Sequence, residues 1–276
     1  MRNNDGAWFT PHAELHATND KDLMDLKSEK CPKGSWPIYK GESFDIWKCD
    51  TGKYYAWADA DRTTKYLQAK IIKTFRRETS PFYGLEEKAV CDKKEMPWNR
   101  PRIVFRNITN RTNTRTFIVA LVPPHVFCAN HGPYFVKVKG DEKDEAYLLG
   151  ILSSIPLDWY VRCFVELNAN FFLINPIPIP KADKNCILRK RVIEISGRLA
   201  SQDNRFTGWA EKVGVDCAQI KEEIKNDMIN ELDAVVAHLY GLNKTQLSHI
   251  FETFHVGWDY TDRLKKTLVH YDNWKK

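Results

Sequence analysis

The sequence predicts an α+β fold, in which a mixed β-sheet domain with long loops is followed by a C-terminal helical segment. Before about residue 180, short β-rich runs such as 102–105 and 116–122 alternate with clusters of Asn, Thr, Pro and Gly, which interrupt strands and form loops. After residue 181, apolar residues recur at the three- and four-residue spacing of amphipathic helices. We therefore expect an α+β domain over residues 31–180 and a helical region over residues 181–276.

The first part of this domain is rich in both aromatic and basic residues. They interleave from Trp36 to Tyr66. Such a mixture can stack on bases and hold phosphates, or it can be a twisted sheet with its aromatics in the core and its lysines in water. For most of these residues we favour the sheet.

The second half of the domain should contain helices that belong to the core. Apolar residues have helical spacing from Glu145 to about Glu166, and Pro156 forces a break between two helices. The stretch Asn175 to Pro180 has three prolines, which suit neither a helix nor a central strand. We expect it to be a linker.

Beyond the linker, the clearest helix runs from about Ala218 to Tyr240 and carries one apolar stripe. Gly241 is placed to end it. Asn243, followed three residues later by Gln246, has the spacing of a capping box that opens a helix through Phe254. A last helix should follow Thr261. These stripes favour packing over catalysis.

Composition places the chain among globular proteins. Its 276 residues are 43% hydrophobic, which suffices for a sizeable core. No run approaches the ~20 apolar residues of a membrane helix, and the polar N-terminus lacks the apolar region of a signal peptide. The seven scattered cysteines include no C-x-x-C pair, so we expect free thiols in a reducing compartment. These observations predict a cytoplasmic protein without a membrane partner.

The formal net charge of +6 is modest, but its distribution is uneven. No Asp or Glu occurs between Asn99 and Gly140, and this acid-free segment contains seven basic residues: Arg100, Arg102, Arg106, Arg111, Arg115, Lys137 and Lys139. We expect the segment to carry a positive potential that attracts a polyanion such as DNA. The alternative is a solvated face whose counter-charges come from elsewhere in the fold.

Known catalytic motifs are absent from the sequence. It contains no G-x-G turn, phosphate-binding loop, H-E-x-x-H helix or G-x-S-x-G elbow. The stretch 175–178 echoes the tetrapeptide of adenine methyltransferases but lacks the aromatic residue that stacks on the flipped base. Acidic clusters at 86–87 and 141–142 supply residue types that a nuclease needs, although a solvated face is favoured. We predict no catalytic residue, metal site or cofactor site in this chain.

Four stretches of the sequence resemble one known family. They are 16–20 with Leu23; 36–44; 102–109, continuing through the Thr-Asn-Thr-Arg-Thr turn at 112–116 to Pro123; and 157–162 with 168–172, 178–180, 231–234 and 238–242. Together they resemble the C-terminal target-recognition region of adenine-specific DNA methyltransferases of type IIG-like restriction-modification systems and related phage-defence systems. Asn107 departs from the family, where Asp is commoner.

The resemblance implies a recognition fragment that is not an enzyme by itself. In the family, an upstream domain binds S-adenosylmethionine and methylates adenine N6. Residues 1–30 would then be the junction to a missing upstream methyltransferase domain, and the partners would be double-stranded DNA and that domain or subunit. A different function stays open, in which the C-terminal helices dock the chain onto a methyltransferase or translocase as a scaffold.

For DNA recognition, we expect loops of the α+β domain to enter the major groove, where Arg and Asn read base edges and Lys holds phosphates. The leading candidates are Arg106, Arg111, Asn113 and Arg115. Secondary candidates are Lys40, Lys48, Arg62, Lys65, His131 and Lys137. For Arg106 and Arg115, an internal salt bridge is an almost equally favoured alternative.

Overall fold

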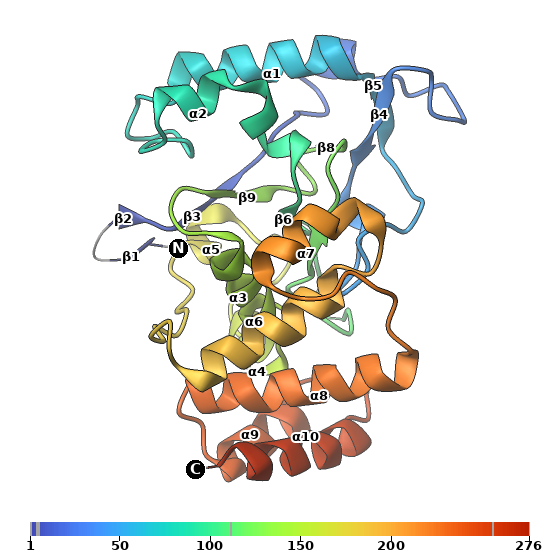
Figure 1. The fold of residues 1–276 in the computed structure, drawn as a ribbon. Coiled ribbons are helices and arrows are strands. Elements are labelled where there is room, and N and C mark those ends of the chain that lie inside the picture. Colours follow the sequence, from blue (N-terminus) through green and yellow to red (C-terminus); the bar gives the residue numbers. More distant parts are fainter. Residues whose placement is uncertain (1, 4–5, 111, 256, 276) are drawn as a thin grey trace. The chain divides into compact units, whose positions relative to one another are not determined.

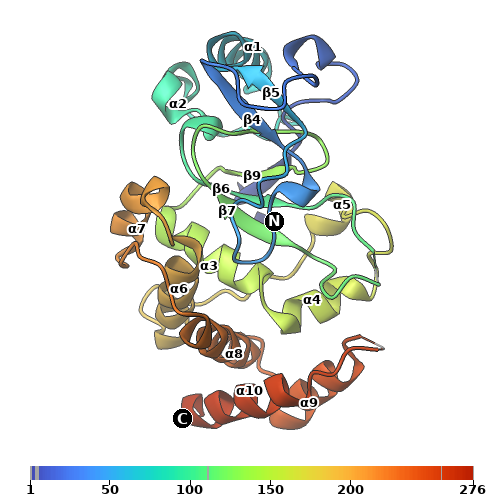
Figure 2. The ribbon, with the colours of Figure 1, turned by 90° about the vertical axis from the view of Figure 1, so that its right-hand side faces the viewer.

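The computed structural model describes residues 2–3, 6–110, 112–255 and 257–275. The chain divides into two compact units. Unit 1 comprises Met1–Ile108, Ile118–Gly140 and Ala169–Pro176, and unit 2 comprises Thr109–Phe117, Asp141–Asn168 and Ile177–Lys276. Unit 1 holds the sheets and unit 2 is built of helices (Figures 1 and 2). The predicted α+β class is confirmed.

The main sheet of unit 1 has four antiparallel strands in the order β3-β9-β6-β7. Their bounds are Phe9–His12 for β3, Tyr134–Lys137 for β9, Arg102–Phe105 for β6 and Val119–Val122 for β7. Strands β6 and β7 are buried along their whole length, because both faces of the sheet are covered. The ring of Phe105 packs against Phe135 and against Phe171 of α5 (Phe171–Ile174).

A second sheet of unit 1 has the strand order β5-β4-β8. Strand β4 (Ser35–Tyr39) is antiparallel to β5 (Ala56–Asp59) and parallel to β8 (Phe127–Cys128). Strand β1 (Arg2–Asn3) pairs antiparallel with β2 (Gly6–Ala7). Single 3-10 turns complete the unit: η1 (Lys21–Leu23), η2 (Gly41–Ser43), η3 (Lys93–Glu95) and η4 (Pro97–Asn99).

Helix α1 (Ala60–Thr74) follows β5 directly. The Asp59 carboxylate accepts the backbone N–H of Arg62 at 2.7 Å and caps the helix. Thr63, Leu67 and Ile71 recur every four residues and are buried, whereas the opposite face is exposed. In Figure 1, α1 lies beside α2 (Glu87–Cys91), and the Gln68 amide donates to two carbonyls there. The sheet predicted up to Tyr66 is therefore wrong from Ala60 onward, where the chain is helical.

Unit 2 begins its helices with α3 (Glu142–Leu152) and α4 (Ile155–Arg162). The predicted break between them is confirmed, because Pro156 lies in the first turn of α4, where its missing N–H costs nothing. Helix α6 (Ile187–Ala200) packs closely on α3: a Cβ added at Gly150 would lie 2.6 Å from Val192. The turn η5 (Asn204–Phe206) and α7 (Thr207–Val213) follow.

Three helices end the chain: α8 (Glu222–Leu239), α9 (Lys244–Thr253) and α10 (Thr261–Trp274). The predicted stop at Gly241 is confirmed by its left-handed φ of 67°, and the predicted capping box between Asn243 and Gln246 is present. Helices α8 and α10 lie side by side in both views (Figures 1 and 2). Ala234, Ala237 and Ile250 belong to a shared apolar core.

The two units divide the chain differently from the boundary expected at residue 180. Residues 109–117 and 141–168 belong to unit 2, because α3 packs on α6 and α4 packs on α8 and α9. The described part of residues 1–30, the stretch expected to be a junction to an upstream domain, belongs to unit 1, where Phe9 and Leu15 are fully buried. No helix in the described ranges is long and apolar enough to span a membrane.

Candidate nucleic-acid interface

The acid-free segment contributes a buried arginine to unit 1. Arg102 on β6 is 3% exposed, and its guanidinium lies 3.3 Å from the Glu14 carboxylate. It also donates to the carbonyl oxygens of Pro97 and Val126. Burial raises the pKa of the Glu14 carboxyl, and the Arg102 charge opposes that rise. Arg102 therefore connects β6 to its neighbours, and its guanidinium is used within the fold.

Two further arginines of the segment have acidic partners in unit 1. The Arg106 guanidinium donates to the Phe44 carbonyl at 2.6 Å and pairs with Asp45 at 3.4 Å, with 20% of its side chain exposed. Arg100 pairs with Glu95 at 2.9 Å. Arg106, a leading DNA-binding candidate, thus forms the internal salt bridge that was its alternative.

The turn at 109–117, which contains the Thr-Asn-Thr-Arg-Thr motif, is held within unit 2 by one carboxylate. The Asp158 side chain is fully buried and accepts the Nε of Arg115 at 2.6 Å. It also accepts the backbone N–H groups of Thr116 and Phe117. The Arg115 side chain is 12% exposed and donates to the Ser153 carbonyl as well. Arg115 therefore stabilises the turn and does not face solvent.

Arg162 of α4 holds the same turn from another side. Its guanidinium donates to the Thr116 hydroxyl, to the Asn113 carbonyl at 2.7 Å and to the Phe254 carbonyl. Asn113 is half-buried. Arg111, the remaining leading candidate, lies outside the described residues, so its role stays a prediction.

Three secondary candidates are also engaged or partly covered. Lys40 pairs with Glu42 at 2.8 Å, and the Lys40 ammonium lowers the pKa of the Glu42 carboxyl. His131 is half-buried near the Tyr55 ring. Lys137, at the end of β9, is half-buried.

Together these contacts correct the expectation of a positive potential on the acid-free segment. Each described arginine of the segment is paired with an acid from outside the segment. This agrees with the alternative interpretation, in which the counter-charges come from elsewhere in the fold. The pairs span long stretches of sequence, 88 residues for Arg102 with Glu14 and 43 for Arg115 with Asp158. A local count of charges therefore could not reveal them.

The exposed face of α1 has the opposite character. Arg62, Lys65 and Lys73 are exposed and form no ion pair within the part of the chain that the structure describes. With Ala69, they lie at a three- to four-residue spacing and so share one side of the helix. Arg62 and Lys65 were secondary candidates, and sequence reasoning did not single out Lys73. Two features of the sequence indicate this helix and its exposed side: Asp59 is a suitable N-cap, and Thr63, Leu67 and Ile71 recur every four residues on the buried side.

A tight turn exposes another cation of unit 1. Asp45 and Lys48 exchange two backbone hydrogen bonds of 2.9 Å, and between them the buried Trp47 adopts a left-handed φ of 57°, which is uncommon for a bulky residue. The Lys48 side chain is exposed and without an ion pair in the described chain, as is that of Lys53. These two lysines are therefore further exposed cations of unit 1.

The acidic clusters serve structural purposes. Glu87 pairs with Arg76, and Glu142 pairs with Lys212. Asp141 caps α3 through the backbone N–H of Asp144. Over the described ranges, no three His, Cys, Asp or Glu side chains are arranged to hold a metal ion.

Comparisons with known proteins add little to this geometry. No protein-family model matches the chain, and no curated protein matches it. Among solved structures, the chain is similar to the type IIL restriction-modification enzyme MmeI in complex with DNA, with a TM-score of 0.45 and 12% sequence identity. The match covers 89% of this chain but 35% of that enzyme, so the chain spans about a third of its length. Likeness at this level does not establish a shared fold.

Proposed function

We propose that the chain is a double-stranded DNA recognition module of a restriction-modification or phage-defence adenine methyltransferase. The observation that carries this proposal is the face of α1, where Arg62, Lys65 and Lys73 are exposed and lack acidic partners among the described residues. The major groove of DNA admits an α-helix, and each phosphate that Lys or Arg neutralises releases condensed counterions. The four motif stretches support the choice of family.

The residues of α1 would have different roles. Arg62, in the first turn, would read a base edge, because a guanidinium can donate two hydrogen bonds to guanine. Lys65 and Lys73 would hold phosphates and fix the position of the helix on the duplex. Lys48 and Lys53 would supply further phosphate contacts from the loop of the same unit.

Catalysis would lie outside this chain. A separate methyltransferase domain or subunit would bind S-adenosylmethionine and transfer the methyl group, and the present chain would determine which adenine it reaches. This division makes the methyltransferase the second partner that we propose.

The proposal is tested with the triple variant Arg62→Ala/Lys65→Ala/Lys73→Ala and a matched control, Lys221→Ala/Lys265→Ala/Lys266→Ala. The control removes the same charge from exposed lysines without ion pairs in the described part of unit 2. Duplex affinity is measured against salt concentration. Since the slope of log K against log salt is about 0.9 per phosphate neutralised, the loss of the Lys65 and Lys73 contacts in the α1 variant should lower its magnitude by about 1.8, and the control should leave it unchanged.

Sequence specificity is tested by selecting bound duplexes from a randomised pool. The wild-type chain should enrich one sequence, and Arg62→Ala alone should relax one position of it, by about 1–3 kcal/mol of discrimination. Equal slopes in the α1 and control variants would contradict the assignment of α1. A wild-type chain that binds no duplex would refute the DNA-recognition function.

The scaffold alternative rests on large apolar side chains exposed in the C-terminal region. Ile224, Trp258 and Val269 are 49%, 53% and 61% exposed. Docking through such residues would depend little on ionic strength, whereas DNA binding weakens steeply as salt rises. Co-sedimentation with a methyltransferase subunit at low and high salt separates the two functions.

A further inference from the structure

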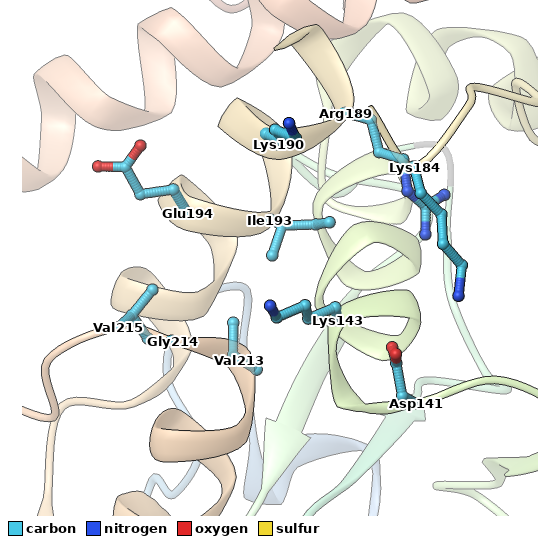
Figure 3. Close-up of a pocket in the computed structure, with 10 residues that line it drawn as sticks. All are labelled: Asp141, Lys143, Lys184, Arg189, Lys190, Ile193, Glu194, Val213, Gly214 and Val215. Carbon is cyan, nitrogen blue, oxygen red and sulfur yellow. The ribbon is translucent and has the colours of Figure 1, made fainter. Parts of the chain in front are cut away.

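Unit 2 contains a pocket that the proposed function has not used. It has a volume of about 540 Å³ and lies among α3, the segment before α6, α6 itself and the end of α7 (Figure 3). Its walls carry charged and apolar side chains: Asp141, Lys143, Lys184, Arg189, Lys190, Ile193, Glu194, Val213, Gly214 and Val215.

The charges of this pocket do not cancel. Four of its lining residues are cationic and two are acidic. Arg189 is paired with Asp144, and Glu194 is paired with Arg191, so these two are already satisfied.

The remaining cations are Lys143, Lys184 and Lys190. All three are exposed, and none forms an ion pair with any residue that the structure describes. The one other acid, Asp141, is the N-cap of α3. The pocket therefore presents a surplus of positive charge.

The opposite wall is apolar. Val213 and Val215 flank Gly214, which ends α7 in a left-handed conformation with φ of 88°. Figure 3 shows the Lys143 side chain extending from α3 toward Val213, so a cation and the apolar wall face the same space. A ligand that fits this arrangement combines an anionic group with a less polar body.

We propose that this pocket binds the phosphate of a nucleotide unit. Lysine ammonium groups are compact point charges that bind phosphate well, while the sugar or base would lie against Val213 and Val215. The phosphate could come from the backbone of the recognised DNA or from a free nucleotide. The DNA source rests on the proposed function, and the free-nucleotide source does not.

The test uses the full chain and the variant Lys143→Ala/Lys184→Ala/Lys190→Ala, with Lys221→Ala/Lys265→Ala/Lys266→Ala as the charge-matched control. Because the three pocket lysines are exposed, circular dichroism and thermal unfolding should match those of the wild type. One arm measures duplex binding against salt concentration. The other arm measures binding of adenosine monophosphate by calorimetry.

If the phosphate belongs to DNA, the pocket variant should lower the magnitude of the salt slope by about 0.9, the value for one phosphate contact, and the control should not. If it belongs to a free nucleotide, the wild-type chain should bind adenosine monophosphate and the pocket variant should bind it at least about tenfold more weakly. Either result supports the site.

The site is overturned if the pocket variant matches the control in both arms. This outcome is distinguishable from failure of the proposed function: a chain whose DNA affinity depends on α1 but not on the pocket retains the function and loses the site. Conversely, a chain that binds adenosine monophosphate through these lysines, but no duplex, retains the site and loses the function.

Discussion

The acid-free segment at 99–140 and helix α1 are both basic in sequence, yet they use their charges in opposite ways. Arg102, Arg106 and Arg115 are mostly covered, and each is paired with a carboxylate. On α1, Arg62 and Lys65 are exposed and unpaired among the described residues. A guanidinium presents five donors in a rigid fork, which suits it to join several carbonyls inside a fold. Basic residues in a sequence therefore indicate an interface only where the structure shows them exposed and without acidic partners.

The largest effect is expected for the variant Arg102→Met, which tests whether the arginines of the acid-free segment stabilise the fold. It leaves the Glu14 carboxylate buried without its cation, so we expect the free energy of unfolding to fall by about 3–5 kcal/mol. Because burial raises the pKa of Glu14, the loss of stability in this variant should depend on pH. Protonated Glu14 is tolerated at low pH, so the deficit should grow as pH rises through its folded-state pKa. Urea denaturation at several pH values measures both effects.

The control for this variant is Arg100→Met, because Arg100 and Glu95 form an exposed pair with side chains 41% and 51% accessible. Such pairs contribute about 0–1 kcal/mol. Equal losses in the two variants would show that Arg102 is not a buried structural residue.

The next effect should come from Arg115→Met. Asp158 would keep its two backbone donors but lose its charged partner, and we expect a loss of about 3 kcal/mol in unfolding free energy. Duplex affinity, measured at a temperature where the variant is folded, should stay within about twofold of wild type, because Arg115 does not contact DNA in our proposal. A stable variant with abolished DNA binding would instead identify Arg115 as a reader.

A smaller effect is expected from Lys65→Ala on α1. The variant should unfold like the wild type, since surface substitutions usually change stability by less than about 0.5 kcal/mol. The magnitude of its salt slope for duplex binding should fall by about 0.9, one phosphate contact. The matched control is Lys221→Ala, and an equal change there would show only a nonspecific dependence on net charge.

The smallest effect should come from the double variant Lys40→Ala/Glu42→Ala, which removes a cation together with its acidic partner. The Lys40 ammonium is already paired with Glu42, so removing both charges together should hardly change the salt slope. Fluorescence titrations at several salt concentrations compare this double variant with Lys65→Ala. A slope change as large as that of Lys65→Ala would mean that ion pairing does not predict which cations bind DNA.

The helical part of the fold could be predicted because its signals are local. The break at Pro156, the stop at Gly241 and the capping box at Asn243 depend on residues within one turn of each other. Helix α1 was missed because its buried repeat lies among aromatic residues typical of strands. Its apolar residues are also not confined to one side, as Ile72 is 43% exposed.

The candidate site could be predicted only in part. Arg62, Lys65 and Lys48 were among the secondary candidates, but nothing in the sequence ranked them above Arg106 and Arg115. That ranking depends on Asp45 and Asp158, acids whose proximity is decided by tertiary packing. The motif at 112–116 and the stretch 157–162 were noted separately, and the structure joins them through Asp158 and Arg162.

Helix α1 has one buried side and one exposed side, and this allows the exposed side to be changed without changing the buried one. Thr63, Leu67 and Ile71 are buried on one side of the helix, while the side chains at positions 62, 65, 69 and 73 are exposed and form no ion pair within the described chain. Those four positions can be randomised together in a library with little loss of folded protein. If the helix reads DNA, such a library is a direct source of variants with new target sequences.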